Sequence, residues 1–101
     1  MASRILIDSR QQVGAYHVAL VKLLSVTPEK IRPDGYKLNC TLIDLRINRA
    51  VLILDNHEPF GYHLHPNPLA DHDQREPLVV ASPFEAIDLF VKKAREMTNE
   101  K

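Results

Sequence analysis

The side chains best suited to chemistry gather between residues 55 and 65, which read Asp-Asn-His-Glu-Pro-Phe-Gly-Tyr-His-Leu-His. This stretch of eleven residues holds three of the five histidines of the chain, together with two acids. Imidazole gains and loses a proton near neutral pH and is also a common metal ligand. The composition therefore indicates acid/base chemistry or metal binding, and the candidate residues are Asp55, Asn56, His57, His63 and His65.

Alternation along the chain suggests how these side chains meet. Residues 60–65 alternate apolar or aromatic side chains with histidines, which is typical of a short strand. In extended backbone, His63 and His65 point to the same face, with their α-carbons ~6.5 Å apart. Residues 55–57 follow the apolar run 50–54, so we expect them to converge on the two histidines if the two segments pair.

Two kinds of chemistry fit this cluster. As a metal site, His57, His63 and His65 would bind a divalent transition metal such as zinc or iron, with Asp71 or His72 as a further ligand. As a metal-free site, one neutral and one protonated imidazole would remove the 2′-hydroxyl proton of RNA and protonate the departing oxygen.

A third interpretation involves no chemistry. It places His63 and His65 on the solvated face of an edge strand while Tyr62 and Leu64 pack inward. His17, which lies beside a strand, and His72, in a polar loop, are interpreted in the same way.

Four apolar runs predict the strands that must position the cluster, namely 4–8, 13–26, 36–47 and 50–54. The second run fits a helix as well, but its valines and its two-residue alternation favour a strand. Asn48-Arg49 separates the last two runs, a spacing that predicts a tight hairpin between antiparallel neighbours. The polar, proline-bounded segment 66–77 predicts a mobile loop.

The end of the chain predicts an amphipathic helix over 82–98. Ser82, Pro83 and Glu85 form a helix-start signature, in which serine caps and glutamate reaches back. The apolar side of this helix is predicted to hold Phe84, Ile87, Phe90, Val91, Ala94 and Met97. The fold class expected is α+β, an antiparallel meander of four to five strands with the helix packed on one face.

Length, charge and hydropathy limit the kinds of protein that this chain can be. The chain has 101 residues, and we expect residues 1–101 to form a single domain. The formal charge is zero, which argues against binding nucleic acid by global electrostatics, although residues 1–50 carry eight lysines and arginines against four acids. A lone cysteine, Cys40, is expected to be a small buried hydrophobe. No apolar run reaches the ~20 residues that span a bilayer, so we expect a cytoplasmic protein without a membrane partner.

The order of these motifs resembles that of TumE-type toxins from toxin–antitoxin systems. The resemblance covers residues 36–97 and rests on Val-Leu-Ile-Leu-Asp-Asn-His-Glu-Pro at 51–59, His-Leu-His at 63–65 and the helix from Ser82 to Ala94. It implies a toxin that acts on RNA and is held inactive by an antitoxin protein carrying a helix-turn-helix. It also implies that Asp55 or Asn56 orients an imidazole while His63 or His65 acts as base or acid.

Together these observations predict a toxin that cleaves RNA by metal-independent histidine acid/base chemistry, with no cofactor. A non-enzymatic module that binds protein or nucleic acid is the alternative from another class. A small metal-binding protein using His57, His63 and His65 is the third.

Overall fold

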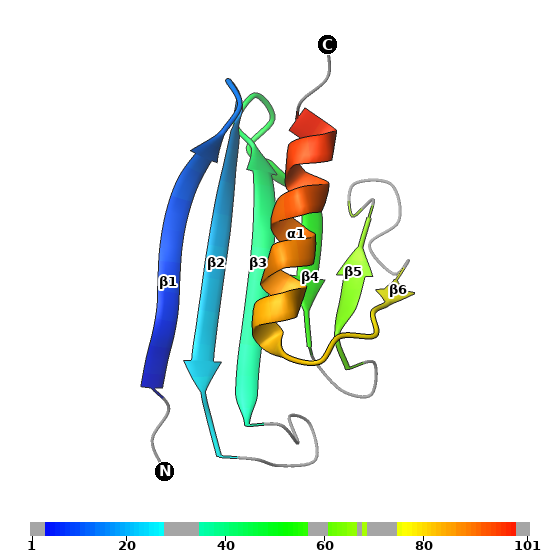
Figure 1. Ribbon diagram of the computed structural model, residues 1–101. Coiled ribbons are helices and arrows are strands. Elements are labelled where there is room, and N and C mark those ends of the chain that lie inside the picture. Colours follow the sequence, from blue (N-terminus) through cyan, green and yellow to red (C-terminus); the bar gives the residue numbers. More distant parts are fainter. Residues whose placement is uncertain (1–3, 28–34, 57–60, 67, 69–74, 99–101) are drawn as a thin grey trace.

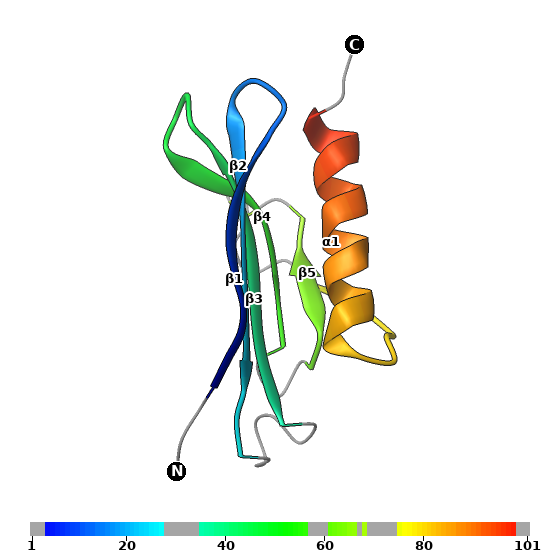
Figure 2. The same cartoon turned by 60° about the vertical axis from the view of Figure 1, so that its left-hand side comes forward.

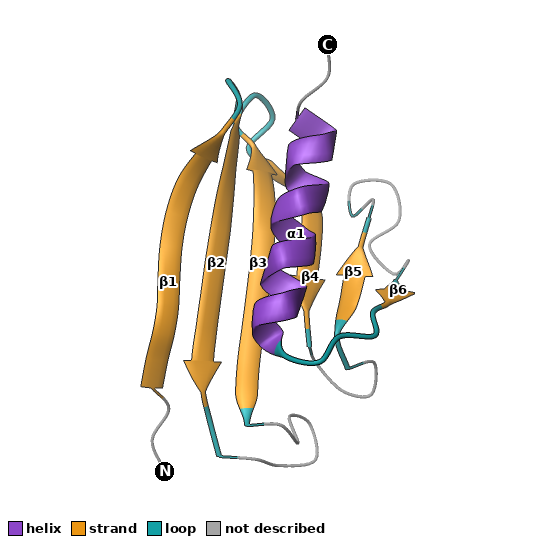
Figure 3. Ribbon diagram, in the orientation of Figure 1, coloured by secondary structure: helices purple, strands orange, loops and turns teal. Residues whose placement is uncertain are grey.

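The computed structural model describes residues 4–27, 35–56, 61–66, 68 and 75–98 (Figure 1). Within these ranges six strands form one antiparallel sheet, in which each strand pairs with its neighbour in sequence. The strands are β1 (Arg4–Val13), β2 (His17–Ser25), β3 (Tyr36–Asp44), β4 (Arg49–Asp55), β5 (His63–His65) and β6 (Glu76–Pro77). A single helix in the described part of the chain, α1 (Pro83–Thr98), packs across the sheet (Figure 3). The predicted α+β meander is therefore confirmed, with one more short strand than expected.

Two elements differ in length from the prediction. β1 runs to Val13 and not only to residue 8, because it pairs with β2 over its whole length while most of its side chains face solvent. Within the run 13–26, residues 17–25 form a strand, β2, and not a helix. Val13 belongs to β1, and Gly14, with a φ of 67°, begins the turn of residues 14–16 between the two strands. The second half of β1 was not predicted as a strand because it is polar and includes two glutamines. A strand that is open to water needs no apolar alternation.

The β3–β4 hairpin has a longer turn than the two residues expected. Residues 45–48 form it, Arg49 already belongs to β4, and Asn48 adopts a positive φ of 55°. The Asp44 side chain holds the turn, because its Oδ1 accepts the backbone N–H of Arg46 at 2.9 Å. An aspartate that accepts a backbone N–H two residues on is a common way to stabilise a turn.

The core lies between the sheet and α1. Alternate strand residues supply fully buried side chains, namely Leu23, Leu38, Cys40, Leu42, Leu52 and Leu54. The helix contributes Phe90 between two buried alanines, Ala86 and Ala94, whose small side chains let the helix lie close to the sheet. Burying a side chain the size of Phe90 contributes about 1.5–3 kcal/mol.

The helix start is as predicted, but its inner face is narrower. Glu85 donates its N–H to Ser82 Oγ at 3.2 Å, and the Glu85 carboxylate accepts the N–H of Ala81. Phe84 and Met97, expected on the inner side, are partly exposed because the buried stripe follows Pro83, Ala86, Phe90 and Ala94. No helix in the described ranges is both long and apolar enough to cross a bilayer.

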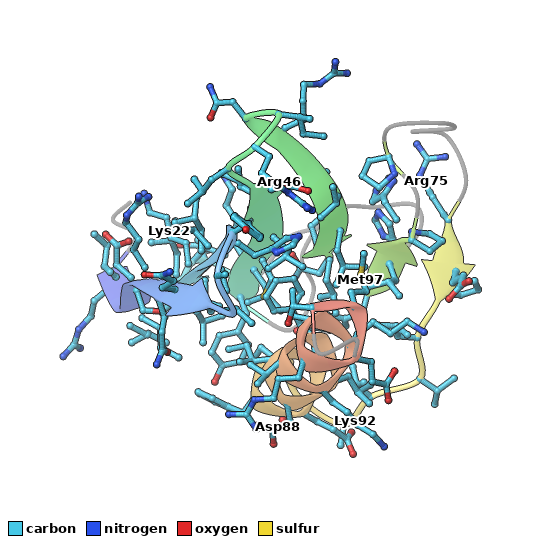
Figure 4. The ribbon with its side chains drawn as sticks, turned by 90° about the horizontal axis from the view of Figure 1, so that it is seen from above. Lys22, Arg46, Arg75, Asp88, Lys92 and Met97 are labelled. Carbon is cyan, nitrogen blue, oxygen red and sulfur yellow. The ribbon has the colours of Figure 1, made fainter. Side chains whose placement is uncertain are left out.

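The helix covers only one face of the sheet (Figure 2). Directly opposite residues of antiparallel neighbours share a face. Strand pairing therefore places Asp8, Lys22, Asn39, Asp55 and His63 in one continuous row across five strands. Figure 4 shows Lys22 on the side of the sheet away from α1, whereas Asp88 and Lys92 project from the helix to solvent. We call the side of this row the open face.

Candidate functional site

Three of the predicted site residues meet on the open face, at the end of β4 and on β5. Asp55 lies directly opposite His63, and Ile53 lies opposite His65, so the two segments pair as the expected convergence required. His63 Nε2 lies 2.8 Å from Asp55 Oδ1. Asp55 and His63 are thus joined by a hydrogen bond between a carboxylate and an imidazole.

His63 is held from both sides. Its Nδ1 lies 2.7 Å from the carbonyl oxygen of Gly61, and since a carbonyl only accepts, Nδ1 carries a proton and donates it. Its Nε2 lies at hydrogen-bond distance from the Asp55 carboxylate, so the two groups are placed to share a proton. Gly61 has a φ of 60°, a conformation that favours glycine and aims this carbonyl at the ring.

His65 stands beside this pair. The rings of His63 and His65 have centroids 4.9 Å apart and meet edge to face at 65°. One ligand atom each from Asp55, His63 and His65 lies within 4.8 Å of the other two. Asp55 and His63 are close enough to exchange a proton, and the three atoms together could hold one divalent ion.

Exposure differs along the cluster. His63 is 3% exposed, whereas His65 is half-buried and the Asp55 side chain is 27% exposed. Solvent therefore reaches the cluster through Asp55 and His65. The interpretation that both histidines are solvated is wrong for His63, because β5 is flanked by β6 and Pro77 lies opposite His63, while Leu64 packs inward as expected.

Asn56 is turned away from the cluster and has a structural contact of its own. Its Oδ1 accepts the N–H of Leu38 at 3.0 Å, and its Nδ2 donates to the carbonyl of Tyr36 at 2.8 Å. The buried amide thereby continues the β3–β4 ladder by one residue and fixes the chain directly after Asp55. Asn56 therefore fixes the backbone next to Asp55, and its amide is bonded to the start of β3 and not to His63 or His65.

Other predicted participants lie outside the described residues. They are His57, proposed above both as a catalytic residue and as a metal ligand, and the further ligands Asp71 and His72. Most of the predicted mobile loop 66–77 also lies outside them, except for Pro66, Pro68 and Arg75 and the two residues of β6.

Cys40 lies beneath the cluster on the helix-covered side. It is fully buried, and this burial, together with the nearby Asp55 carboxylate, raises the pKa of the thiol to about 12. A thiol with such a pKa is protonated at neutral pH and is a poor nucleophile. Cys40 is therefore part of the core, as expected, and not a reactive group of the site.

A second aspartate–histidine pair was missed from the sequence. His17 Nε2 lies 3.6 Å from Asp44 Oδ2, and Arg46 binds both oxygens of the same carboxylate at 3.1 and 2.8 Å. The side-chain hydrogen bonds of Arg46 lower the pKa of Asp44 to about 2. Arg46 also lies over the Tyr16 ring, 4.7 Å from its centroid. Asp44 and Arg46, two apart in a turn, were the only local signal; His17 joins them through strand pairing.

Comparison of the chain with protein-family models, with curated proteins and with solved structures found no match. Function is therefore inferred from the residues of the site and their geometry.

Proposed function

We propose that this protein is the toxin of a toxin–antitoxin system and cleaves RNA without a metal ion, using Asp55, His63 and His65. The observation that supports this most is the hydrogen bond of 2.8 Å between Asp55 and the buried His63, with the His65 ring alongside on the open face. A carboxylate that holds one imidazole next to a second imidazole supplies both partners of acid/base catalysis.

In this mechanism His65 is the base. It takes the proton of a 2′-hydroxyl, whose oxygen then attacks the adjacent phosphorus. The proton held between His63 Nε2 and Asp55 Oδ1 passes to the departing 5′-oxygen, with Asp55 as the more exposed member of the pair. The products are a 2′,3′-cyclic phosphate and a 5′-hydroxyl end, and the two transfers balance without any further reagent.

RNA is the substrate that the surrounding surface favours. The open face carries three exposed basic side chains, Arg10, Lys22 and Lys37, on the strands that precede the site. Asn39 and Thr41, hydrogen-bonded to each other at 3.0 Å, lie between these basic side chains and the site. A protein of zero net charge can still bind a phosphate backbone when its lysines and arginines share one face with the reactive groups.

The assignment as a toxin rests on the resemblance to TumE-type toxins in the order of the Asp-Asn, His-x-His and helix motifs. Asp55 and His63, which belong to two of these motifs, are in contact across β4 and β5, which supports treating them as one functional unit. We further propose that a helix-turn-helix antitoxin is the partner and that the pair acts in the cytoplasm.

The test is cleavage of a single-stranded RNA by the purified chain in the presence of EDTA. We expect cleavage that leaves 2′,3′-cyclic phosphate ends, and no cleavage of the DNA of the same sequence, because DNA lacks the 2′-hydroxyl. The His65→Gln protein, purified in the same way, controls for contaminating nuclease. Intact RNA, or equal cleavage by His65→Gln, would contradict the proposal.

A metal site is the second candidate function, and one observation favours it. A histidine that binds a metal through Nε2 commonly donates its Nδ1–H to a backbone carbonyl, as His63 does to Gly61. Asp55, His63 and His65 would form a site of two imidazoles and one carboxylate for zinc or iron. Zinc titration followed by melting separates the two candidates. A rise in the melting temperature that Asp55→Asn abolishes, together with cleavage that EDTA removes, would favour the metal site.

A further inference from the structure

The two edges of the sheet are protected to different degrees. β6 has only two residues, and one of them, Pro77, has no N–H to offer a neighbouring strand. β1, at the other edge, has ten residues without proline or glycine, and it pairs with β2 alone among the described strands. Its exposed side chains include Ile5 and Leu6. A long, unblocked edge with exposed apolar residues is a surface on which another strand can pair.

The helix leaves room beside β1. A groove of about 570 Å³ separates the helix-facing side of β1, with Ser9, Gln11 and Val13, from the second half of α1. Figure 1 shows α1 lying over the middle of the sheet, with β1 uncovered at its margin. The sheet can therefore be extended past β1 without a clash with the helix.

We propose that the occupant of this edge is a second copy of the chain, paired antiparallel through β1 about Ser9. An antiparallel pair related by a twofold axis at Ser9 places Asp8 of each copy directly opposite Arg10 of the other. Asp8 and Arg10 are exposed, and both project from the open face, in register with Lys22 and Leu20 of β2. The pairing thus forms two identical opposite-charge pairs across the seam.

Other registers of the same strand are less favourable. Centring the axis on Ile7 places Arg4 opposite Arg10, and centring it on Asp8 or Arg10 opposes two identical charges at the axis itself. Centring it on Leu6 pairs Arg4 with Asp8 but uses only five residues, and it falls on the irregularity between Ile5 and Ile7. The Ser9 register spans residues 5–13, and its central pairs, over residues 7–11, lie outside that irregularity. It is the longest register without opposed like charges.

The test is the molecular mass in solution, measured by analytical ultracentrifugation over a wide range of protein concentration. We expect twice the mass of one chain for the wild type. Asp8→Arg and Arg10→Asp each turn both attractive pairs into repulsive ones, so each variant alone should dimerise about ten- to a hundredfold more weakly. Lys37→Glu, an exposed charge reversal on β3 away from the edge, is the matched control and should dimerise like the wild type.

Mixing the two edge variants tests the register itself. One copy then carries two arginines and the other two aspartates at positions 8 and 10, so the mixture should form a heterodimer about as tight as the wild-type dimer. A monomeric wild type, edge variants that dimerise normally, or a mixture that stays monomeric would each overturn the proposal. Far-ultraviolet circular dichroism of each variant confirms that it is folded.

Discussion

The described part of the molecule contains two aspartate–histidine pairs, each formed by residues directly opposite each other on neighbouring strands. His17 and Asp44 join β2 to β3 next to a turn, while Asp55 and His63 join β4 to β5 on the open face. The first pair is 3.6 Å apart and its carboxylate is bound by the Arg46 guanidinium; the second is 2.8 Å apart and lies beside another imidazole, that of His65.

The difference between these pairs shows that the neighbours of a histidine decide what it can do. At Asp44, the carboxylate accepts hydrogen bonds from the guanidinium and the backbone N–H of Arg46 and is part of a turn. These hydrogen bonds favour the ionised form of the carboxylate. At Asp55, the carboxylate lies at hydrogen-bond distance from an imidazole whose other nitrogen donates to Gly61. The first arrangement stabilises a hairpin, and the second is suited to proton transfer.

The largest expected effect separates the two pairs in living cells. When the chain is expressed without a partner, we expect growth arrest with the wild type and with His17→Gln, and normal growth with His65→Gln, because only His65 belongs to the proposed site. Growth curves at equal protein levels, checked by immunoblot, measure this. If the His65→Gln variant arrests growth as strongly as the wild type does, the open-face cluster is not the functional site.

The next effect concerns stability rather than chemistry. Asn56→Ala leaves the N–H of Leu38 and the carbonyl of Tyr36 without their side-chain partner, so we expect a loss of about 2–4 kcal/mol in the free energy of unfolding. Asn39→Ala is the matched control, since Asn39 is exposed, and it should change that free energy by no more than about 0.5 kcal/mol. Urea denaturation measures both. Equal effects of the two variants would show that the Asn56 amide does not anchor the end of β4.

A smaller effect is expected from acid. The pKa of Asp44 falls from 3.8 to about 2 on folding, chiefly through the hydrogen bonds of Arg46, so below pH 3.8 the unfolded chain binds more protons at this site than the folded one. The Asp44 contribution to stability is therefore complete above pH 3.8 and is lost as the pH falls toward 2. Melting temperatures of the wild type and Asp44→Asn should converge over this interval; a constant difference down to pH 2 would contradict the role of Arg46.

The smallest effect is an absence of reaction. Because the Cys40 thiol is buried and its pKa is about 12, we expect no labelling by iodoacetamide at neutral pH while the protein is folded, and complete labelling in urea. Mass spectrometry of the alkylated chain gives the result. Rapid labelling of the folded protein would mean that the helix-covered side opens to solvent beneath the site.

Much of the fold could be predicted because most strands have one covered side. Alternating apolar residues identified β2 and β3, a continuous apolar run identified β4, and the Ser82 and Glu85 signature identified the start of α1. β6 has two residues, too few to show any alternation, and the exposed second half of β1 carries none. Phe84 and Met97 are exposed because the buried stripe of the helix follows Pro83, Ala86, Phe90 and Ala94, and periodicity did not reveal that Pro83 and Ala86 face the sheet.

The site was predictable where it depended on local spacing. His63 and His65 share a face because they are two apart in a strand, and Asp55 reaches them because β4 and β5 pair. The contacts of Asn56 depend on the start of β3, 18 and 20 residues away, and the pairing of His17 with Asp44 depends on the β2–β3 register. Contacts of this kind are set by the packed sheet and leave no pattern in a single sequence.

The most direct test of the central distinction compares cleavage rates of one RNA, in EDTA, by variants of the two pairs. We expect His63→Gln and Asp55→Asn each to lose about 10²- to 10⁴-fold, with the double variant losing hardly more, because the two residues hold one proton together. His17→Gln should cleave at the wild-type rate. If His63→Gln cleaves as fast as the wild type, or His17→Gln loses as much as Asp55→Asn, then the open-face pair is not the catalytic one.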